Sequence, residues 1–186
     1  MTGGEIVAAI PGCSVTPLVR HTDARGEFVK VFQRSANPDA GDRDQIAELF
    51  WSRSSRGVIR GLHFQIPPFA HRKLVTIVSG TAVDVVLDLR VGSPTYRKLQ
   101  VVAFDAAAPL ALSVPIGCAH GFQATSDDVT ILYATTTEHA PGADRGVRWD
   151  TIGFAWPIAA AITSPRDSSL AALDDYQSPF LFEGRP

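Results

Sequence analysis

The residues best suited to moving protons lie in the middle and the second half of the chain. The unperturbed pKa of a histidine side chain lies near neutral pH, so the imidazole of His63 is suited to act as a general base. Lys73 would stabilise a developing oxyanion, and the Tyr133 phenol can donate a proton. Asp167 would fix the tautomer of the histidine, as the carboxylate of a His–Asp dyad does. These four side chains together predict a proton-transfer site, although each taken singly also fits an ordinary structural role.

The sequence around these residues resembles the two halves of a cupin barrel. The first half contains His63-Phe64-Gln65, and the second contains the Pro-x-Gly-x-x-His pattern that ends at His120. A metal-binding cupin has a second histidine and a downstream glutamate in the first half, where this chain has Gln65 and Lys73. An ammonium group repels a metal cation, and we therefore predict a site that uses neither a metal nor another cofactor.

Arg60 lies three residues before His63, so strict alternation along a strand places the two side chains on opposite faces. Both can face one cavity only if the strand contains a bulge or a kink. Gly61 is the residue that would permit such an irregularity. We predict one there, with Arg60 as a substrate-binding residue.

Short runs with a period of two predict the strands that must position these residues. In residues 81–90, Val83 and Val85 share one parity while Asp84 and Asp88 share the other, which predicts a half-buried strand. Similar runs, separated by turn signals, cover residues 73–79, 98–104, 110–115 and 129–136. Helical patterns are confined to residues 42–50 and 168–176. We predict an all-β fold, a cupin-type jelly-roll barrel with a few short peripheral helices, whose mouth holds one ligand.

Length and composition limit the classes of protein that remain. At 186 residues the chain is short for two domains, so we expect a single domain over residues 1–186. A net charge of −2 gives no reason to expect binding to nucleic acid or to membranes, and no run approaches about 18 apolar residues. The two cysteines, Cys13 and Cys118, fit neither a disulfide framework nor a zinc motif. This indicates a reducing compartment, and we expect a cytoplasmic protein.

An ordered series of motifs runs through nearly the whole chain. The motifs are D-x-R-G-x-F at residues 23–28, S-x-S-x-x-G-V-x-R-G-L-H-F-Q at 52–65, K-L-V at 73–75, D-L-R-x-G-S-P-T-Y at 88–96, P-x-G-x-A-H-G-F at 115–122 and R-G-V-R-W at 145–149. In this order and at these spacings, the sequence resembles the dTDP-4-dehydrorhamnose 3,5-epimerase family of sugar-nucleotide cupins.

The resemblance implies metal-free epimerisation of a nucleotide-linked 4-keto-6-deoxyhexose at C3, at C5 or at both. It implies that His63, paired with Asp167, is the base that removes a proton from the sugar and thereby converts it to an enolate. Lys73, together with Arg60, would stabilise the enolate oxygen, and Tyr133 would return a proton from the opposite face.

The resemblance also implies a set of substrate-binding residues and a partner. His120 would line the sugar pocket, with Gln65 as a further substrate-binding residue. Arg25 would contact the diphosphate, and Phe28 would stack on the nucleobase. In this family the residue at the position of Phe28 often acts from the partner subunit of a homodimer. We therefore expect a homodimer that binds a nucleotide-sugar substrate.

Three departures from the family pattern fall in the nucleotide-binding region: Lys30 stands for a glutamate, Glu48 for a glutamine and Phe50 for an asparagine. A further departure is His139, which stands for a tyrosine. The identity of the base therefore stays open between dTDP-, CDP- and GDP-linked sugars. His71 and His139 are expected at the surface or at the rim of the site.

Two rival functions use the same fold. One is a nucleotide-keto-sugar 3,4-ketoisomerase, which moves the carbonyl instead of inverting a centre. The other is a cupin that binds a sugar nucleotide without turning it over. The complete set of base, acid and oxyanion cation favours the epimerase over both.

Overall fold

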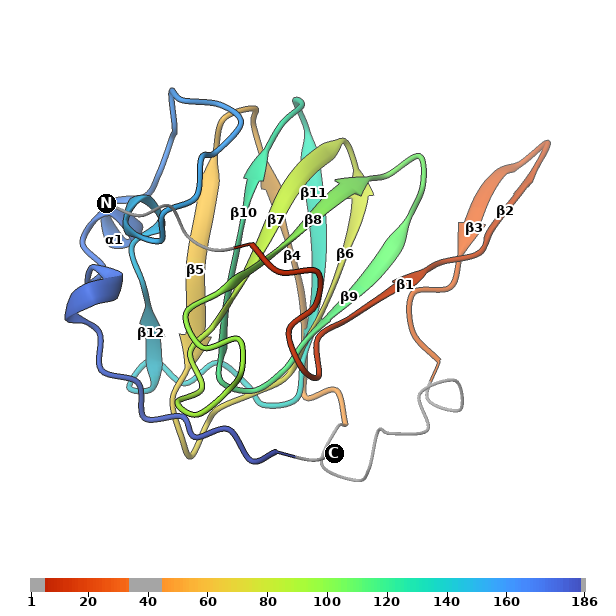
Figure 1. Cartoon of the computed structure of the whole chain (residues 1–186). Helices are drawn as coiled ribbons and strands as arrows, with labels where there is room; N and C mark the ends of the chain where they lie inside the picture. The colour runs from red at the N-terminus through yellow and green to blue at the C-terminus, as the bar shows by residue number, and fades with distance from the viewer. Residues whose placement is uncertain (1–5, 34–44, 185–186) are drawn as a thin grey trace.

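Two antiparallel five-stranded sheets pack face to face in the computed structural model, which describes residues 6–33 and 45–184 (Figure 1). One sheet has the order β12 (Asp144–Gly146), β5 (Ile59–Gln65), β10 (Cys118–Ala124), β7 (Thr81–Asp88) and β8 (Leu99–Asp105). The other has the order β1 (Ser14–Pro17), β9 (Leu110–Val114), β6 (Lys73–Ser79), β11 (Val129–Thr135) and β4 (Glu48–Ser54). This arrangement confirms the predicted jelly-roll barrel.

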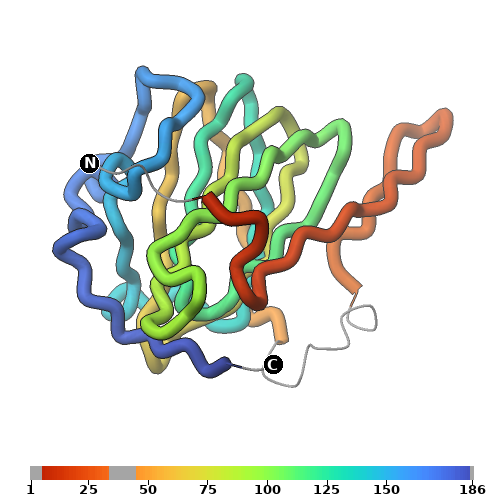
Figure 2. The backbone as a smooth tube through the Cα atoms, in the orientation of Figure 1, coloured from red at the N-terminus to blue at the C-terminus, as the bar shows by residue number. Residues whose placement is uncertain are grey.

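Two further features lie outside the barrel. The hairpin of β2 (Arg20–Asp23) and β3 (Gly26–Val29) projects away from the sheets, as Figure 2 shows. The C-terminal segment runs along the opposite side and contains α1 (Pro165–Ser168) and two 3₁₀ turns, Trp149–Thr151 and Leu173–Asp175. No helix in the described part of the chain is long and apolar enough to cross a membrane.

The sheets enclose one apolar core between them, and a second apolar cluster covers the outer face of β7. The inner core includes Val75, Phe122 and Ile131, which come from both sheets. The outer cluster packs Val85 and other strand residues against the C-terminal segment. The prediction that residues 81–90 form a half-buried strand is therefore wrong, because β7 is buried on both faces and its aspartates point into the barrel.

Neither of the two helices predicted from sequence is formed over the described residues of its predicted range. Within residues 42–50, Glu48 to Phe50 begin β4, residues 45–47 are not helical, and residues 42–44 lie outside the described residues. All seven residues of β4 pair with β11, and this long-range pairing outweighs the helical pattern. Residues 168–176 contain only the end of α1 and the 3₁₀ turn at Leu173–Asp175.

The irregularity predicted at Gly61 is confirmed. His120 pairs with His63 and Phe122 pairs with Arg60, so three residue steps in β5 oppose two in β10. Gly61 has a φ of +131°, and a Cβ placed on it would lie 2.5 Å from the Cα of Gly121. The extra residue turns Arg60 and His63 to the same side, and both line one cavity.

We expect Gly61→Ala to destabilise the protein by about 2–5 kcal/mol, because the methyl group meets backbone at a φ that disfavours a side chain. Chemical denaturation measures this loss. Gly142→Ala is the matched control, since nothing lies within 4 Å of its added Cβ, and its effect should stay within about 0.5 kcal/mol. Equal stability of the Gly61→Ala and Gly142→Ala proteins would contradict the close approach of β5 and β10.

Candidate active site

A cavity of about 630 Å³ opens between the two sheets. Its wall includes seven of the side chains that the sequence marked as catalytic or substrate-binding: Arg60, His63, Gln65, Lys73, His120, Tyr133 and Asp167. They come from β5, β6, β10, β11 and α1, so residues far apart in sequence meet around one space.

His63 and Asp167 form a dyad. The His63 Nε2 lies 2.7 Å from Asp167 Oδ1, and the Gly61 N–H donates to Oδ2 at 3.2 Å. The short helix α1 fixes Asp167, because the Ser164 hydroxyl accepts from its backbone N–H at 3.0 Å and Pro165 begins the turn. With Nε2–H donated to the carboxylate, Nδ1 keeps the lone pair of the base.

Burial and pairing decide the charges of this dyad. Burial lowers the pKa of His63 below its ordinary value, and the opposing effect of Asp167 does not reverse this. Burial acts to raise the pKa of Asp167, but His63, the Gly61 N–H and Arg166 together outweigh burial, and the pKa is lowered. At neutral pH the pair is therefore a neutral imidazole beside a carboxylate, which is the form that accepts a proton.

Lys73 lies next to the dyad on β6. Its Nζ donates to the backbone carbonyl of His63 at 2.8 Å. Burial lowers the pKa of Lys73 to about 8, against the attraction of Asp144 and Asp84, so most of the ammonium is still charged at neutral pH. Arg60 faces the same cavity and is held by the Ser54 hydroxyl at 3.0 Å.

The Tyr133 phenol is the acid that the sequence suggested. Its hydroxyl lies 3.4 Å from Ser52 Oγ, and its ring packs against Phe50 and His120. Burial raises the pKa of Tyr133 well above its ordinary value, so the phenol keeps its proton at every working pH. It can therefore donate a proton, and it cannot serve as a resting base.

His120 is held by Asp84, a residue that sequence reasoning missed. His120 Nε2 lies 2.7 Å from Asp84 Oδ2, and both side chains are buried. Burial raises the pKa of Asp84, and the pair with His120 offsets part of the rise. The sequence signal was present in the alternation of residues 81–90, but it pointed to a solvent-facing aspartate.

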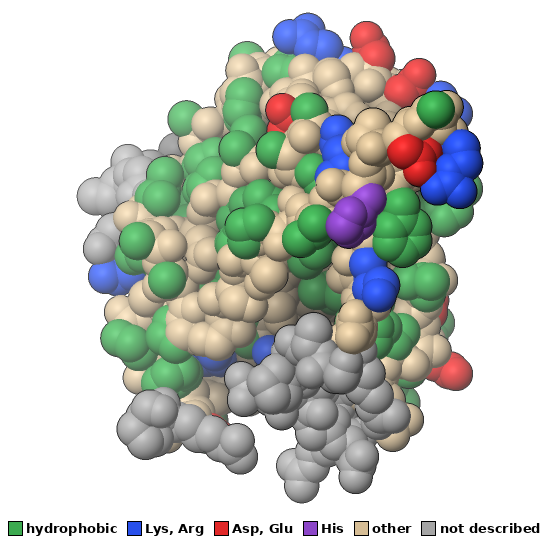
Figure 3. Space-filling view, turned by 90° about the vertical axis from the view of Figure 1, so that its right-hand side faces the viewer, with side chains coloured by type: hydrophobic (Ala, Val, Ile, Leu, Met, Phe, Trp, Pro, Cys, Tyr) green, Lys and Arg blue, Asp and Glu red, His purple; other side chains and the backbone are tan. Residues whose placement is uncertain are grey.

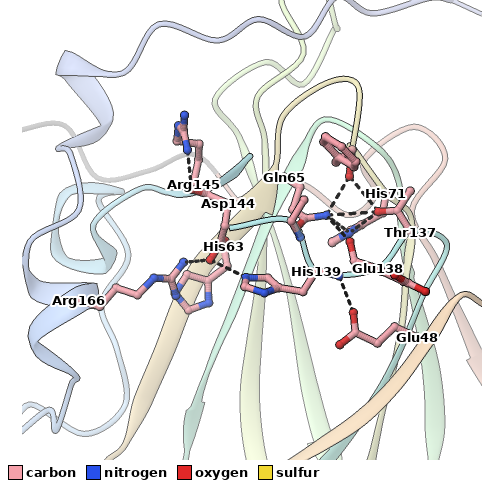
Figure 4. A network of polar contacts seen from close by, with 12 residues as sticks. Glu48, His63, Gln65, His71, Thr137, Glu138, His139, Asp144, Arg145 and Arg166 are labelled. Carbon is pink, nitrogen blue, oxygen red and sulfur yellow. Dashed lines mark hydrogen bonds and ion pairs between the residues drawn. The ribbon is translucent and has the colours of Figure 1, made fainter. Parts of the chain in front are cut away.

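Arg166 and Asp144 are the other residues that sequence reasoning missed. Arg166 Nη2 donates to Asp144 Oδ2 at 2.6 Å, and Nη1 lies 3.1 Å from His63 Nε2 (Figure 4). Arg166 and Asp167 thus contact the same imidazole nitrogen, and Arg166 Nη1 lies 3.7 Å from Asp167 Oδ1. The only signal in the sequence was the position of Arg166 immediately before Asp167.

Gln65 forms a fixed part of the wall. Its Oε1 accepts from the Ala140 N–H at 2.6 Å, and its Nε2 donates to the Phe69 carbonyl at 2.9 Å. Backbone groups therefore bind both the oxygen and the nitrogen of the Gln65 side-chain amide, and contact between Gln65 and the substrate stays a prediction. His71 lies in the wall beside it, and the ring of His139 is exposed at the mouth.

Arg25 and Phe28 do not line the cavity of their own chain. Both belong to the projecting hairpin, where Arg25 pairs with Asp23 at 2.5 Å and Phe28 is 59% exposed. Their predicted contacts with the nucleotide would therefore have to come from another subunit.

The cavity thus combines a neutral imidazole, a charged ammonium and a protonated phenol. This combination suits removal of a proton next to a carbonyl and its return to the same carbon. Burial raises the pKa of the Cys118 thiol, and Cys118 does not line the cavity.

Comparison with known proteins agrees with this geometry. Residues 7–175 match the family model described as dTDP-4-dehydrorhamnose 3,5-epimerase. The enzyme of that name from Mycolicibacterium smegmatis is 36% identical over 96% of this chain and 89% of its own length. A dTDP-4-dehydrorhamnose 3-epimerase from Streptomyces niveus is also 36% identical, over 86% of this chain and 78% of its own.

Solved structures give the same result. A dTDP-6-deoxy-D-glucose-3,5-epimerase from Legionella pneumophila, in complex with dTDP-4-keto-L-rhamnose, superposes with a TM-score of 0.85 and 27% identity. The match covers 92% of this chain and 93% of that one. The chain therefore belongs to the dTDP-4-dehydrorhamnose 3,5-epimerase family, and it is an epimerase with the cupin-type jelly-roll fold.

Proposed function

We propose that this enzyme epimerises a nucleotide-linked 4-keto-6-deoxyhexose at C3, at C5 or at both, as part of deoxysugar biosynthesis. The observation that carries the proposal is the convergence of His63, Lys73 and Tyr133 on one cavity, with Asp167 behind the base. The reaction needs neither a metal nor another cofactor, because each proton has a side chain to receive it or to supply it.

The first step is deprotonation beside the C4 carbonyl. His63 Nδ1 takes the proton, the C–H electron pair moves toward the carbonyl, and O4 becomes an enolate oxygen. The Lys73 ammonium and the Arg60 guanidinium would stabilise that charge inside a cavity where screening is weak. A positioned base contributes roughly 10² to 10⁴ in rate, and one oxyanion donor about 10² to 10³.

The second step forms a new C–H bond on the opposite face of the sugar. The Tyr133 hydroxyl donates its proton to the enolate carbon, and the charge on O4 returns to a carbonyl. The phenolate then recovers a proton readily, because its pKa is raised. His63 releases its proton to solvent, since its pKa is lowered, and the enzyme is reset.

The nucleotide would lie at the mouth of the cavity. Many named relatives act on dTDP sugars, and this supports dTDP as the first candidate. Glu48, Phe50 and His139 lie in the cavity wall, and they would give the nucleotide a different surface from the family pattern. For this reason CDP and GDP sugars belong in the same test.

We infer that the working unit is a homodimer of single-domain chains in the cytoplasm. The projecting hairpin exposes Phe28 and Arg25, and hydrophobic side chains are spread across the side of the molecule seen in Figure 3. On the outer face of β4, Leu49 is 63% and Trp51 is 65% exposed. A second subunit would cover such side chains, and the free thiols of Cys13 and Cys118 suit a reducing compartment.

The direct test is NMR of dTDP-, CDP- and GDP-4-keto-6-deoxyhexoses incubated with the enzyme in deuterated water. We expect deuterium at C3, at C5 or at both with the accepted nucleotide, and no label with His63→Ala. Label combined with movement of the carbonyl from C4 to C3 would indicate a ketoisomerase. Tight binding of the sugar nucleotide without any label would indicate a cupin that only binds.

The pH dependence of kcat/KM tests the assigned charges. The rate should fall on the acid side as His63 gains a proton, at a pH below the ordinary histidine pKa because burial lowers the pKa of His63, and fall above about pH 8 as Lys73 loses one. Lys73→Arg keeps the cation charged, so its high-pH limb should move up by at least about one unit while its low-pH limb stays in place. An unchanged high-pH limb in Lys73→Arg would contradict the role of Lys73.

Subunit mixing tests the position of the hairpin. Phe28→Ala should raise KM and His63→Ala should abolish turnover, each in its own homodimer. The assay uses substrate well below the KM of the wild-type enzyme. If Phe28 acts in the partner's site, equal mixing makes half of the dimers mixed, each with one intact site, and recovers about a quarter of the wild-type activity. Failure of the mixed protein to exceed the average of the two parents would contradict this arrangement.

A further inference from the structure

The ring of Phe50 lies directly against the ring of Tyr133, the proposed acid. In the pairing of β4 with β11, Phe50 is the cross-strand partner of Tyr133. Their rings stack at a centroid distance of 4.9 Å and an angle of 14°. Both rings line the cavity, so the stack is part of the surface that a sugar would meet.

Two further contacts complete the setting of the phenol. The edge of the His120 ring meets the Tyr133 ring at 6.2 Å and 74°, and Ser52, two residues along β4 from Phe50, reaches the hydroxyl at 3.4 Å. The ring is thus held on one face, at one edge and at its oxygen. Of the three tyrosines in the sequence, Tyr133 alone lines the cavity.

This immobility matters because the substrate has two acidic positions. C3 and C5 flank the carbonyl carbon on opposite sides, and each must receive its proton along its own line of approach. A phenol that can swing reaches both carbons, whereas a phenol fixed in one place is aligned with one of them. Relatives of this chain include enzymes named for two centres and enzymes named for one.

We propose that Phe50 is a specificity-determining, positioning residue that holds Tyr133 in line with one carbon and makes this enzyme predominantly a mono-epimerase. The inference rests on the proposed function. In each turnover His63 takes one proton from that carbon, the electron pair passes through the O4 enolate, and Tyr133 forms the new C–H bond there. Phe50 itself exchanges no proton, so its effect appears in the choice between the two carbons.

The test is the ratio of deuterium incorporated at C3 and at C5, followed with time in deuterated water. We expect the wild-type enzyme to label one carbon at least about five to ten times faster than the other, the bias that a favourable aromatic pair can supply. Phe50→Leu keeps an apolar side chain but removes the flat face, and it should bring the two rates within about twofold of each other. Phe50→Tyr keeps the stack and should keep the bias.

Phe69→Leu is the matched control. Its ring is 47% exposed, close to the 41% of Phe50, but it does not line the cavity. It should leave both rates unchanged, so a general loss of stability is separated from a change in positioning. Equal labelling of both carbons by the wild-type enzyme, or an unchanged ratio in Phe50→Leu, would overturn the proposal.

Failure of the proposed function gives a different result from failure of this inference. If the protein only binds its sugar nucleotide, neither carbon acquires deuterium in any variant, and if it is a ketoisomerase, the carbonyl moves from C4 to C3. If it is an epimerase in which Phe50 has only a structural role, Phe50→Leu lowers both rates in proportion and the ratio stays as it was.

Discussion

The site depends on the contact between β5 and β10 at Gly61 and Gly121, where no side chain fits between the two backbones. This contact forces an extra residue into β5, and the side chains of Arg60 and His63 therefore point to the same side of the sheet. It also presents the Gly61 N–H to Asp167, which ties the carboxylate of the dyad to the same bulge. A single packing constraint therefore aligns the base, its carboxylate and a cation around one cavity.

The second requirement is that one cavity holds a neutral imidazole, a charged lysine and a protonated phenol at the same pH. Burial lowers the pKa of His63 and of Lys73 and raises that of Tyr133. The lysine pKa falls only to about 8, partly because Asp144 and Asp84 oppose the effect of burial. The two aspartates that the sequence left unassigned thus help to keep the oxyanion partner charged.

The sequence was sufficient to predict the jelly-roll fold, the four catalytic candidates and the irregularity at Gly61. Period-two strands, titratable residue types and a conflict of parity each have a local signature. The local signals at Asp84 and Arg166 did not show their roles, and Asp144 had none, because these roles arise from contacts of β7, β12 and α1 with other strands and with each other. The predicted helix was wrong over residues 45–50 for the same reason, because β11 supplies the partner that makes residues 48–50 the start of β4.

The central claim is that His63 removes a proton from a carbon beside the C4 carbonyl. The most direct measurement is a single-turnover experiment in ordinary water with a substrate deuterated at C3 and C5, using the wild-type enzyme and His63→Asn. We predict loss of deuterium from the wild-type product, with the deuterated substrate reacting more slowly than the protonated one, and full retention with His63→Asn. Equal loss of deuterium from both proteins would contradict the account.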